Sequence, residues 1–238
     1  MEFILLAGGK GTRLQSVVSD VPKPLAPIHG QPFLAYILDR IQLYNPTKIV
    51  ISVGYQYEKI IQAIGYDWKN IPIEYTIEDT PLGTGGAIKK VLENTTLQNP
   101  VILNADTYFE CDYQQLIHFH EKQNSTVTIA LKQMYDFNRY GTLMVDENNT
   151  ITAFIEKTYQ QSGTINTGVY SINKAFFLDK MKDKTVFSLE NDFFEKQVHN
   201  NLFKAYTLDK ENYFIDIGIP EDYQKAMDYF ANKINESE

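Results

Sequence analysis

Basic residues, cysteines and long apolar runs are all scarce in this chain of 238 residues. Lys and Arg number 22 against 30 Asp and Glu, and the net charge of −8 argues against non-specific nucleic-acid binding, which relies on basic surfaces. Cys111 is the only cysteine, so no disulfide can form within the chain. The first apolar run, at residues 3–6, has no basic residues before it and is too short for a signal peptide or a membrane span. We therefore expect a cytoplasmic protein without nucleic-acid or membrane partners.

The sequence also has no internal repeat, no low-complexity segment and no obvious linker. Hydrophobic residues make up 43% and charged residues 22%, which are ordinary values for a globular protein. A chain of this length can bury one sizeable core, and α/β folds of this size often form one domain. We predict a single domain over residues 1–238. Because the chain is acidic, a polyphosphate site in it must gather its cations locally and recruit a metal.

The strongest local signal lies in residues 1–25. Residues 2–7 form an apolar run of strand length, and Gly8-Gly9-Lys10-Gly11-Thr12-Arg13-Leu14 follows directly. A buried strand that ends in a glycine-rich loop brings backbone N–H groups close to an anion. Arg13 and Lys23 add two cations, a planar guanidinium and a point charge. This stretch therefore predicts a polyphosphate site.

Two common phosphate-binding motifs do not fit this loop. The dinucleotide fingerprint needs Gly-x-Gly-x-x-Gly, and Leu14 stands where its third glycine would be. A P-loop closes with Gly-Lys-Ser/Thr, whereas this loop closes with Gly11-Thr12-Arg13. A dehydrogenase is therefore excluded on glycine spacing. An ordinary strand-to-helix turn with solvated basic residues stays open on the loop alone.

Apolar strands alternate with helical patterns in the first half of the chain. Strands are expected at 49–53, 73–77 and 100–106, and helices at 33–41, at 57–64 and from about Ala87. This alternation predicts a mostly parallel sheet covered on both faces. Ligands of such sheets bind at the carboxyl ends of the strands. Two glycine-rich loops, 8–11 and 82–86, and the carboxylate of Asp106 stand at such ends.

The second half has a different pattern. Short strands separated by turn residues are expected at 126–131, 142–145, 151–155 and 164–172, followed by a helix at 188–198, strands at 205–208 and 213–215, and a helix from about Pro220. We interpret the short strands as antiparallel additions that extend the sheet and build a lid over the pocket. The predicted fold class is a three-layer α/β/α, Rossmann-like fold with a mixed, mostly parallel sheet.

The loop at residues 6–14, followed by Pro22-Lys23-Pro24-Leu25, resembles the signature of the sugar-1-phosphate nucleotidyltransferases. Later motifs of that family follow in order: Leu82-Gly83-Thr84-Gly85-Gly86-Ala87, Asn104-Ala105-Asp106, Tyr140-Gly141, Glu156-Lys157, Asn166-Thr167-Gly168-Val169-Tyr170 and Phe214-Ile215-Asp216-Ile217-Gly218. Ala105 departs from the family pattern, which usually has glycine before the aspartate. So many motifs in register make a chance match remote. The hexapeptide repeats that some members carry are absent.

The resemblance implies transfer of a nucleotidyl group from a nucleoside triphosphate to a sugar 1-phosphate. It implies a nucleotide-binding half at about 1–112 and a sugar-phosphate-binding half, with the lid, at about 113–238. The nucleotide would bind at Leu6, Ala7, Gly8, Gly9, Gly11, Thr12, Arg13, Glu78, Gly83 and Thr84. The sugar phosphate would bind at Lys23, Tyr140, Gly141, Glu156, Lys157, Asn166, Thr167 and Gly168.

The implied catalytic residues are Arg13, Lys23, Asp106 and Asp216. Asp106 and Asp216 would hold Mg²⁺, which prefers oxygen ligands and binds through one or two carboxylates plus substrate phosphates. Arg13 would hold the triphosphate and stabilise the departing pyrophosphate. Lys23 would bridge the α-phosphate and the sugar phosphate, and Lys157 would hold the sugar phosphate. No covalent intermediate is needed, so we expect one in-line step with inversion at phosphorus.

The choice of base rests on Glu78, which precedes the loop that reads the base in this family. A carboxylate can accept from N1–H and N2–H₂ of guanine together, whereas the carbonyl oxygens of uracil or thymine would repel it. A closer resemblance, to bacterial D-glycero-α-D-manno-heptose 1-phosphate guanylyltransferases, rests on the segments 75–78, 131–134, 137–142 and 214–223. The expected partners are therefore GTP and this sugar 1-phosphate.

Two alternatives stay open. One is another sugar-1-phosphate nucleotidyltransferase, which would use UTP or dTTP, or GTP with mannose 1-phosphate. The other is a catalytically silent sensor of sugar nucleotides on the same fold, and the retention of Arg13, Lys23, Asp106 and Asp216 counts against it. Assembly into a homo-oligomer is also left open by the sequence.

Overall fold

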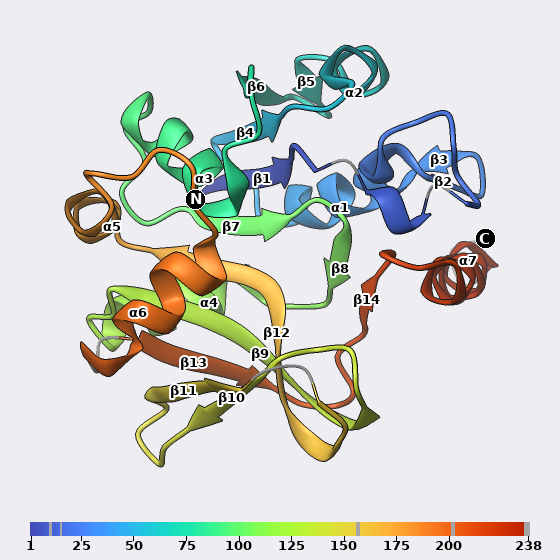
Figure 1. The fold of residues 1–238 in the computed structure, drawn as a ribbon. Coiled ribbons are helices and arrows are strands. Elements are labelled where there is room, and N and C mark those ends of the chain that lie inside the picture. Colours follow the sequence, from blue (N-terminus) through green and yellow to red (C-terminus); the bar gives the residue numbers. More distant parts are fainter. Residues whose placement is uncertain (10, 15, 156–157, 201–202, 236–238) are drawn as a thin grey trace.

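One central sheet joins the two halves of the chain. In the computed structural model, the described residues (1–9, 11–14, 16–155, 158–200 and 203–235) contribute ten strands to this sheet (Figure 1). Its order is β11-β10-β12-β7-β1-β4-β6-β5, with β9 paired to β12 and β13 paired to β9. Within the described ranges, no helix is both long and apolar enough to cross a membrane.

The first half supplies the parallel strands. These are β1 (Glu2–Ala7), β4 (Lys48–Val53), β6 (Ile71–Ile77) and β7 (Val101–Asn104), and β1 lies between β4 and β7. Parallel strands need crossover connections, which helices supply here. The helices of this half are α1 (Phe33–Gln42), α2 (Tyr57–Ile64) and α3 (Gly83–Glu93), and α4 (Tyr113–Lys122) opens the second half. Shorter elements are the 3₁₀ turns η1 (Thr12–Leu14) and η2 (Lys23–Leu25), and the strands β2 (Pro27–Ile28), β3 (Gln31–Pro32) and β5 (Asp67–Trp68).

The second half attaches through one long strand. β12 (Gln160–Ile172) pairs antiparallel with β7 and also with β9 (Val127–Phe137) and β10 (Thr142–Val145). β11 (Ile151–Ile155) pairs antiparallel with β10, and the predicted bounds of both hairpin strands are confirmed. The strand predicted at 205–208 is β13 (Phe203–Leu208), and it runs parallel to β9.

The remaining elements lie outside the central sheet. β8 (Thr107–Phe109) and β14 (Phe214–Asp216) form a separate antiparallel pair. The helical elements are α5 (Lys174–Lys180), the π-helix η3 (Leu189–Phe194), α6 (Glu195–Gln197), the 3₁₀ turn η4 (Val198–Asn200) and α7 (Pro220–Asn235). The helix predicted at 188–198 is thus a succession of π, α and 3₁₀ turns.

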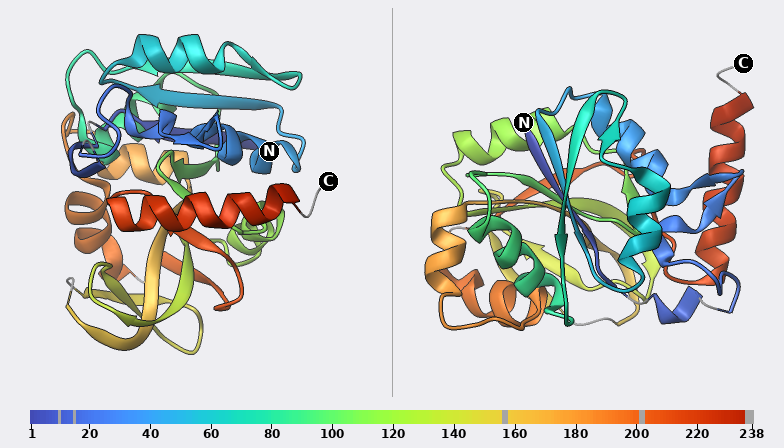
Figure 2. Two further views of the ribbon diagram at one scale, coloured as in Figure 1. Left: turned by 90° about the vertical axis from the view of Figure 1, so that its right-hand side faces the viewer. Right: turned by 90° about the horizontal axis from the view of Figure 1, so that it is seen from above.

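The core lies on both faces of the sheet. Side chains of a strand alternate between faces, so Phe3 and Leu5 of β1 belong to one apolar cluster and Ile4 belongs to the other. Side chains of α1, α2, α4 and α7 pack in the first cluster, and those of α3, α5 and η3 pack in the second. Figure 2 (right) shows α3 and α5 on the opposite side of the sheet from α2 and α7. The predicted three-layer, mostly parallel α/β fold is therefore confirmed.

The start of α3 differs from the prediction. A helix was expected from about Ala87, but α3 begins at Gly83, inside the second glycine-rich loop. Glycine disfavours helix interiors, and tertiary packing overrides that preference here. A methyl group on Gly85 would come within 2.2 Å of the Phe187 ring, and the N–H groups of Gly85 and Gly86 donate to the Phe187 carbonyl at 3.1 and 3.3 Å. These glycines let residue 187 lie directly on the first turn of α3.

Candidate active site

The carboxyl ends of β1, β6 and β7 meet at one edge of the sheet, as their parallel pairing requires. Beyond this edge lies a cavity of about 430 Å³, which we call the glycine-loop pocket. Its lining residues are Leu6, Ala7, Gly8, Gly9, Gly11, Arg13, Lys23, Pro24, Glu78, Pro81, Gly83, Thr84, Ala87, Asn104, Asp106 and Gly218. Of the predicted nucleotide-binding residues, Thr12 is not in this lining, and its side chain lies outside what the structure describes.

Gly11 fixes the shape of the first loop against Lys23. Its φ of +58° lies in the left-handed region, and a methyl group there would come within 2.7 Å of the Lys23 Cβ. Leu14 N–H donates to the Gly11 carbonyl at 3.1 Å and closes the loop into η1. Arg13 stands exposed in this turn and makes no hydrogen bond or ion pair with any described residue. Its guanidinium is therefore available to a ligand.

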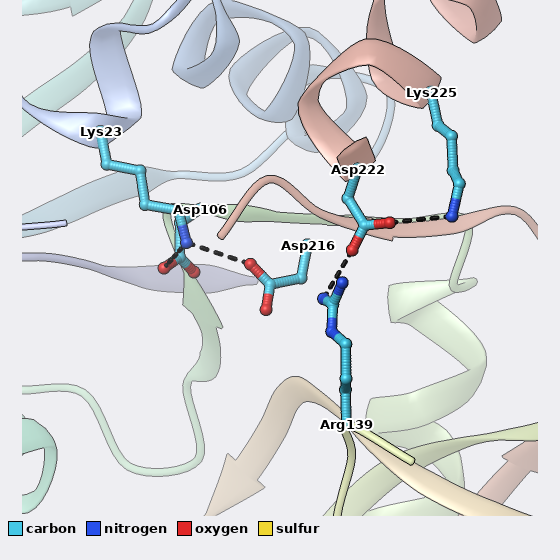
Figure 3. Close-up of polar contacts among 6 residues, drawn as sticks. All are labelled: Lys23, Asp106, Arg139, Asp216, Asp222 and Lys225. Carbon is cyan, nitrogen blue, oxygen red and sulfur yellow. Dashed lines mark hydrogen bonds and ion pairs between the residues drawn. The ribbon is translucent and has the colours of Figure 1, made fainter. Parts of the chain in front are cut away.

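Lys23 joins the two predicted metal ligands (Figure 3). Its ammonium donates to Asp106 Oδ2 at 2.7 Å and to Asp216 Oδ1 at 3.0 Å. The Lys23 side chain is 8% exposed, while those of Asp106 and Asp216 are 37% and 25% exposed. Burial lowers the pKa of Lys23, but the two carboxylates raise it more, and its pKa lies above the ordinary value. Lys23 is therefore a fixed cation between two solvent-reached carboxylates.

The strand pair β8–β14 brings these aspartates together although they are far apart in sequence. Asp216, the last residue of β14, pairs in register with Thr107, the residue after Asp106. The Ile217 N–H then donates to the Asp106 carbonyl at 3.1 Å. The short antiparallel pair thus sets the separation of the two carboxylates.

Glu78 is held at the rim of the glycine-loop pocket by two donors. The Ser52 hydroxyl donates to its Oε1 at 3.1 Å, and the Leu82 N–H donates to its Oε2 at 3.1 Å. A methyl group on Gly8 would come within 2.3 Å of Oε1, so the carboxylate lies against this glycine. An ionised carboxylate offers about four acceptor positions, so two remain for a ligand. Glu78 is therefore a preoriented acceptor.

A second cavity, the lid pocket, of about 690 Å³, lies beneath the second half of the chain. It is lined by Asn104, Thr107, Tyr140, Gly141, Thr142, Leu143, Phe154, Ile155, Asn166, Thr167, Gly168, Tyr170, Ser188, Glu190, Asn191, Glu195, Phe214 and Asp216. Asn104 lines both cavities, so the two pockets meet there. The predicted sugar-site residues Glu156 and Lys157 lie outside the described residues.

Two predicted sugar-site side chains already have partners in the protein. Asn166 donates to the Tyr170 hydroxyl at 3.0 Å and accepts from the Gly168 N–H at 2.9 Å. The buried Thr167 hydroxyl donates to the Ala130 carbonyl at 2.7 Å, so its proton is already used within the protein. These contacts fix the shape of residues 166–168 of β12, which line the lid pocket.

An ion pair beside Tyr140 was not foreseen from the sequence. Arg139 Nη2 lies 2.5 Å from Asp222 Oδ2, and Lys225 Nζ lies 3.0 Å from Oδ1 of the same buried carboxylate (Figure 3). The Arg139 guanidinium also stacks over the Tyr140 ring at 5.6 Å. Asp222 stands in the first turn of α7, where an acidic residue also complements the helix dipole. Its place in the first helical turn was the only signal for Asp222 in the sequence, and that place does not predict Arg139 as its partner.

The π-helix η3 supplies another wall that sequence motifs did not reveal. Glu190 and Asn191 of η3 line the lid pocket, together with Ser188 just before it and Glu195 at the start of α6. Glu190 Oε2 accepts from the Thr84 hydroxyl and from the Ser188 hydroxyl, both at 3.1 Å. Thr84, predicted to bind nucleotide, therefore uses its hydroxyl to join α3 to η3.

Sequence comparison places the chain among known proteins. A family model described as "Nucleotidyl transferase" matches residues 2–233, nearly the whole chain. The chain belongs to the nucleotidyl transferase family. It is 46% identical to the D-glycero-α-D-manno-heptose 1-phosphate guanylyltransferase of Aneurinibacillus thermoaerophilus, over 95% of this chain and 97% of that protein. The enzyme of the same name from Campylobacter jejuni subsp. jejuni is 41% identical, over 94% of this chain and 97% of that protein.

A solved structure supports the same relationship. The crystal structure of HddC from Yersinia pseudotuberculosis complexed with GMP-PN superposes with a TM-score of 0.86 at 37% identity. The match covers 96% of this chain and 99% of that chain. The predicted family is thus confirmed by sequence and by structure.

The carboxylate pair in this nucleotidyl transferase fits a hard divalent cation. Both aspartates offer oxygen donors, and both already face one positive charge, the Lys23 ammonium. The described residues contain no group of three or more His, Cys, Asp or Glu side chains that could hold a metal alone. Magnesium commonly binds through one or two carboxylates and takes its other ligands from water and substrate phosphates. The donor set therefore suits a metal that is shared with a phosphate substrate.

Proposed function

We propose that the chain is a guanylyltransferase that converts GTP and D-glycero-α-D-manno-heptose 1-phosphate into GDP-heptose and pyrophosphate. The observation that carries this proposal is the Lys23–Asp106–Asp216 cluster, which borders both pockets. A reaction that joins a nucleotide to a sugar phosphate needs its cations at such a junction. The heptose 1-phosphate guanylyltransferases that align over nearly the whole chain support the choice of substrates.

The reaction would proceed in one displacement at the α-phosphorus of GTP. A phosphate oxygen of the sugar 1-phosphate forms the new P–O bond, and the bond from the α-phosphorus to the bridging oxygen of pyrophosphate breaks. The nucleophile is already an anion, so the protein has to position the reactants and offset charge rather than remove a proton. Inversion at phosphorus follows from in-line attack.

Each charged residue near the junction has a role in this scheme. Lys23 would bridge the α-phosphate and the sugar phosphate, and the exposed Arg13 would stabilise the pyrophosphate as it leaves. Asp106 and Asp216 would hold Mg²⁺, which, when bound, neutralises phosphate charge. The Lys23 ammonium offsets one of the two negative charges of this pair when substrates are absent, because it contacts both carboxylates.

Glu78 would read the guanine base. Its carboxylate is held by Ser52 and Leu82 and keeps acceptor capacity toward the glycine-loop pocket, where it could accept from N1–H and N2–H₂ together. A site built for a donor pair rejects a base that lacks it by a large factor. Selection of GTP over UTP and dTTP follows.

The test is a matrix of four nucleoside triphosphates against heptose 1-phosphate, mannose 1-phosphate and glucose 1-phosphate, read as pyrophosphate release with Mg²⁺. We expect the highest kcat/KM for GTP with heptose 1-phosphate. Equal efficiency with UTP would overturn the guanylyl assignment, and a preference for mannose 1-phosphate would overturn the sugar assignment. Absence of turnover with every pair would leave a sugar-nucleotide sensor as the better description.

A further inference from the structure

The two carboxylate oxygens of Glu190, a residue that lines the lid pocket, differ in their contacts. Its Oε2 accepts from two hydroxyl groups, whereas its Oε1 has no donor among the described residues. Glu190 lines the lid pocket and is not among the residues that line the glycine-loop pocket. Glu190 therefore has one acceptor oxygen left for a ligand of the lid pocket.

Two hydroxyl groups hold the Glu190 carboxylate in place. The Thr84 hydroxyl donates to Glu190 and accepts from the Leu189 N–H at 2.9 Å, so it ties the side chain and the backbone of η3 to α3. The Ser188 hydroxyl donates to Glu190 and accepts from the Asn191 N–H at 3.2 Å. π-Helical turns in proteins are uncommon and occur frequently at functional sites. A preoriented acceptor of this kind loses little entropy when it binds a hydroxyl group.

The position of Glu190 in the pocket indicates which part of a sugar phosphate it meets. The lid pocket has Asp216 and Thr107 near the cationic junction, and Figure 1 shows α6, which follows η3, and β14 on opposite sides of β12. Glu195 joins Glu190 on the η3–α6 wall, and two carboxylates there repel a phosphate. That wall therefore suits the uncharged, hydroxyl-bearing end of the ligand.

We propose that Glu190 recognises the outermost exocyclic carbon of a heptose, accepting a hydrogen bond from the hydroxyl at C7. This inference rests on the proposed function. A heptose of manno configuration has one more CHOH group outside its ring than mannose has, and the lid pocket that Glu190 lines, at about 690 Å³, has room for it. Glu190 is then a specificity-determining residue, with Thr84 and Ser188 as positioning residues.

The experiment compares Glu190→Gln with wild type on heptose 1-phosphate and on mannose 1-phosphate, with GTP saturating. Gln keeps an oxygen for Thr84 and Ser188 but loses the charge. We expect kcat/KM for heptose 1-phosphate to fall about tenfold to a hundredfold, through KM, because a hydrogen bond to a charged group is lost. The value for mannose 1-phosphate should change less than about threefold, and KM for GTP should stay at the wild-type value. Glu147→Gln, in the exposed turn between β10 and β11, is the matched control for loss of one negative charge.

A change of substrate tests the same contact from the side of the ligand. For wild type, replacing heptose 1-phosphate by 7-deoxy-heptose 1-phosphate should lower kcat/KM by the same factor as Glu190→Gln does on the full substrate. Glu190→Gln should use the two sugars with nearly equal kcat/KM. Equal losses for heptose and mannose 1-phosphates in Glu190→Gln, or no loss at all, would overturn the inference while the proposed function stands. A wild type that does not use heptose 1-phosphate would overturn the proposed function itself.

Discussion

The glycine-loop pocket and the lid pocket meet at Asn104, yet different kinds of contact hold them in shape. The first is formed by backbone close to strand ends, and its exposed cation, Arg13, is tied to no described residue. The second is shaped by side-chain links between distant segments, such as Thr84 with Glu190 and Arg139 with Asp222. Substitutions at the first pocket should therefore change chemistry on an intact fold, whereas those at the second should act through position.

The junction between the pockets should show the largest effect. Asp106→Asn and Asp216→Asn each remove charge from the proposed metal site, so each should lower kcat by on the order of 100-fold or more, since a bound metal contributes several kcal/mol of electrostatic stabilisation. Both side chains are partly exposed, so thermal unfolding should shift little. Asp183→Asn, at an exposed position beyond α5, is the control. Near-normal turnover of either variant at saturating Mg²⁺ would rule out its assignment as a metal ligand.

A substitution at Glu78 tests the glycine-loop pocket alone. Glu78→Gln keeps the shape of the side chain but loses its charge and one acceptor, so kcat/KM for GTP should fall at least about tenfold. The fall should not extend to KM for the sugar phosphate, because Glu78 is absent from the lid pocket. Steady-state kinetics with both substrates varied give both values. If kcat/KM for GTP did not change, Asp79 or the backbone of residues 82–86 would have to recognise the base instead.

The Arg139–Asp222 pair tests the lid pocket. Asp222→Asn leaves the Arg139 guanidinium without its anion, so the loop that carries Tyr140 should lose its anchor on α7. We expect KM for the sugar 1-phosphate to rise about fivefold with little change in kcat, and the free energy of unfolding to fall by about 1–3 kcal/mol. Lys225→Gln is the matched control, because this second partner of Asp222 is 68% exposed and surface ion pairs contribute little. An unchanged KM for the sugar phosphate would show that the pair serves only the fold.

The same contrast explains what could be predicted from the sequence. The fold class, the family and the bounds of β10 and β11 followed from apolar periodicity and from motifs read in order. Asp106 was foreseen as a site residue because it follows an apolar parallel strand, whose carboxyl end is where ligands bind. Its catalytic role, like those of Lys23 and Asp216, stays a prediction.

Contacts across the chain could not be predicted in this way. The link between Thr84 and Glu190 joins residues 106 positions apart, and no local pattern records it. The early start of α3 depends on Phe187 packing over glycines that disfavour a helix by themselves. The π-helical turns of η3 depend on tertiary contacts rather than on the 3.6-residue period of its apolar residues.

His120 lies away from both pockets and should affect stability alone. It is 2% exposed on α4, its Nδ1 lies 2.9 Å from the Thr128 hydroxyl, and burial lowers its pKa from 6.5 to about 4. Between those values the unfolded chain binds a proton that the folded chain does not, so stability should fall as pH falls from 6.5 to 4, by at most about 3 kcal/mol. His120→Asn keeps a partner for Thr128 but cannot titrate, so its unfolding free energy, measured with urea from pH 7.5 to 4.5, should decline less than that of wild type. His118→Asn, exposed on the same helix, should show the same dependence of unfolding free energy on pH as wild type. If the pH curves of all three proteins were parallel, His120 would not be the cause of the loss of stability at low pH.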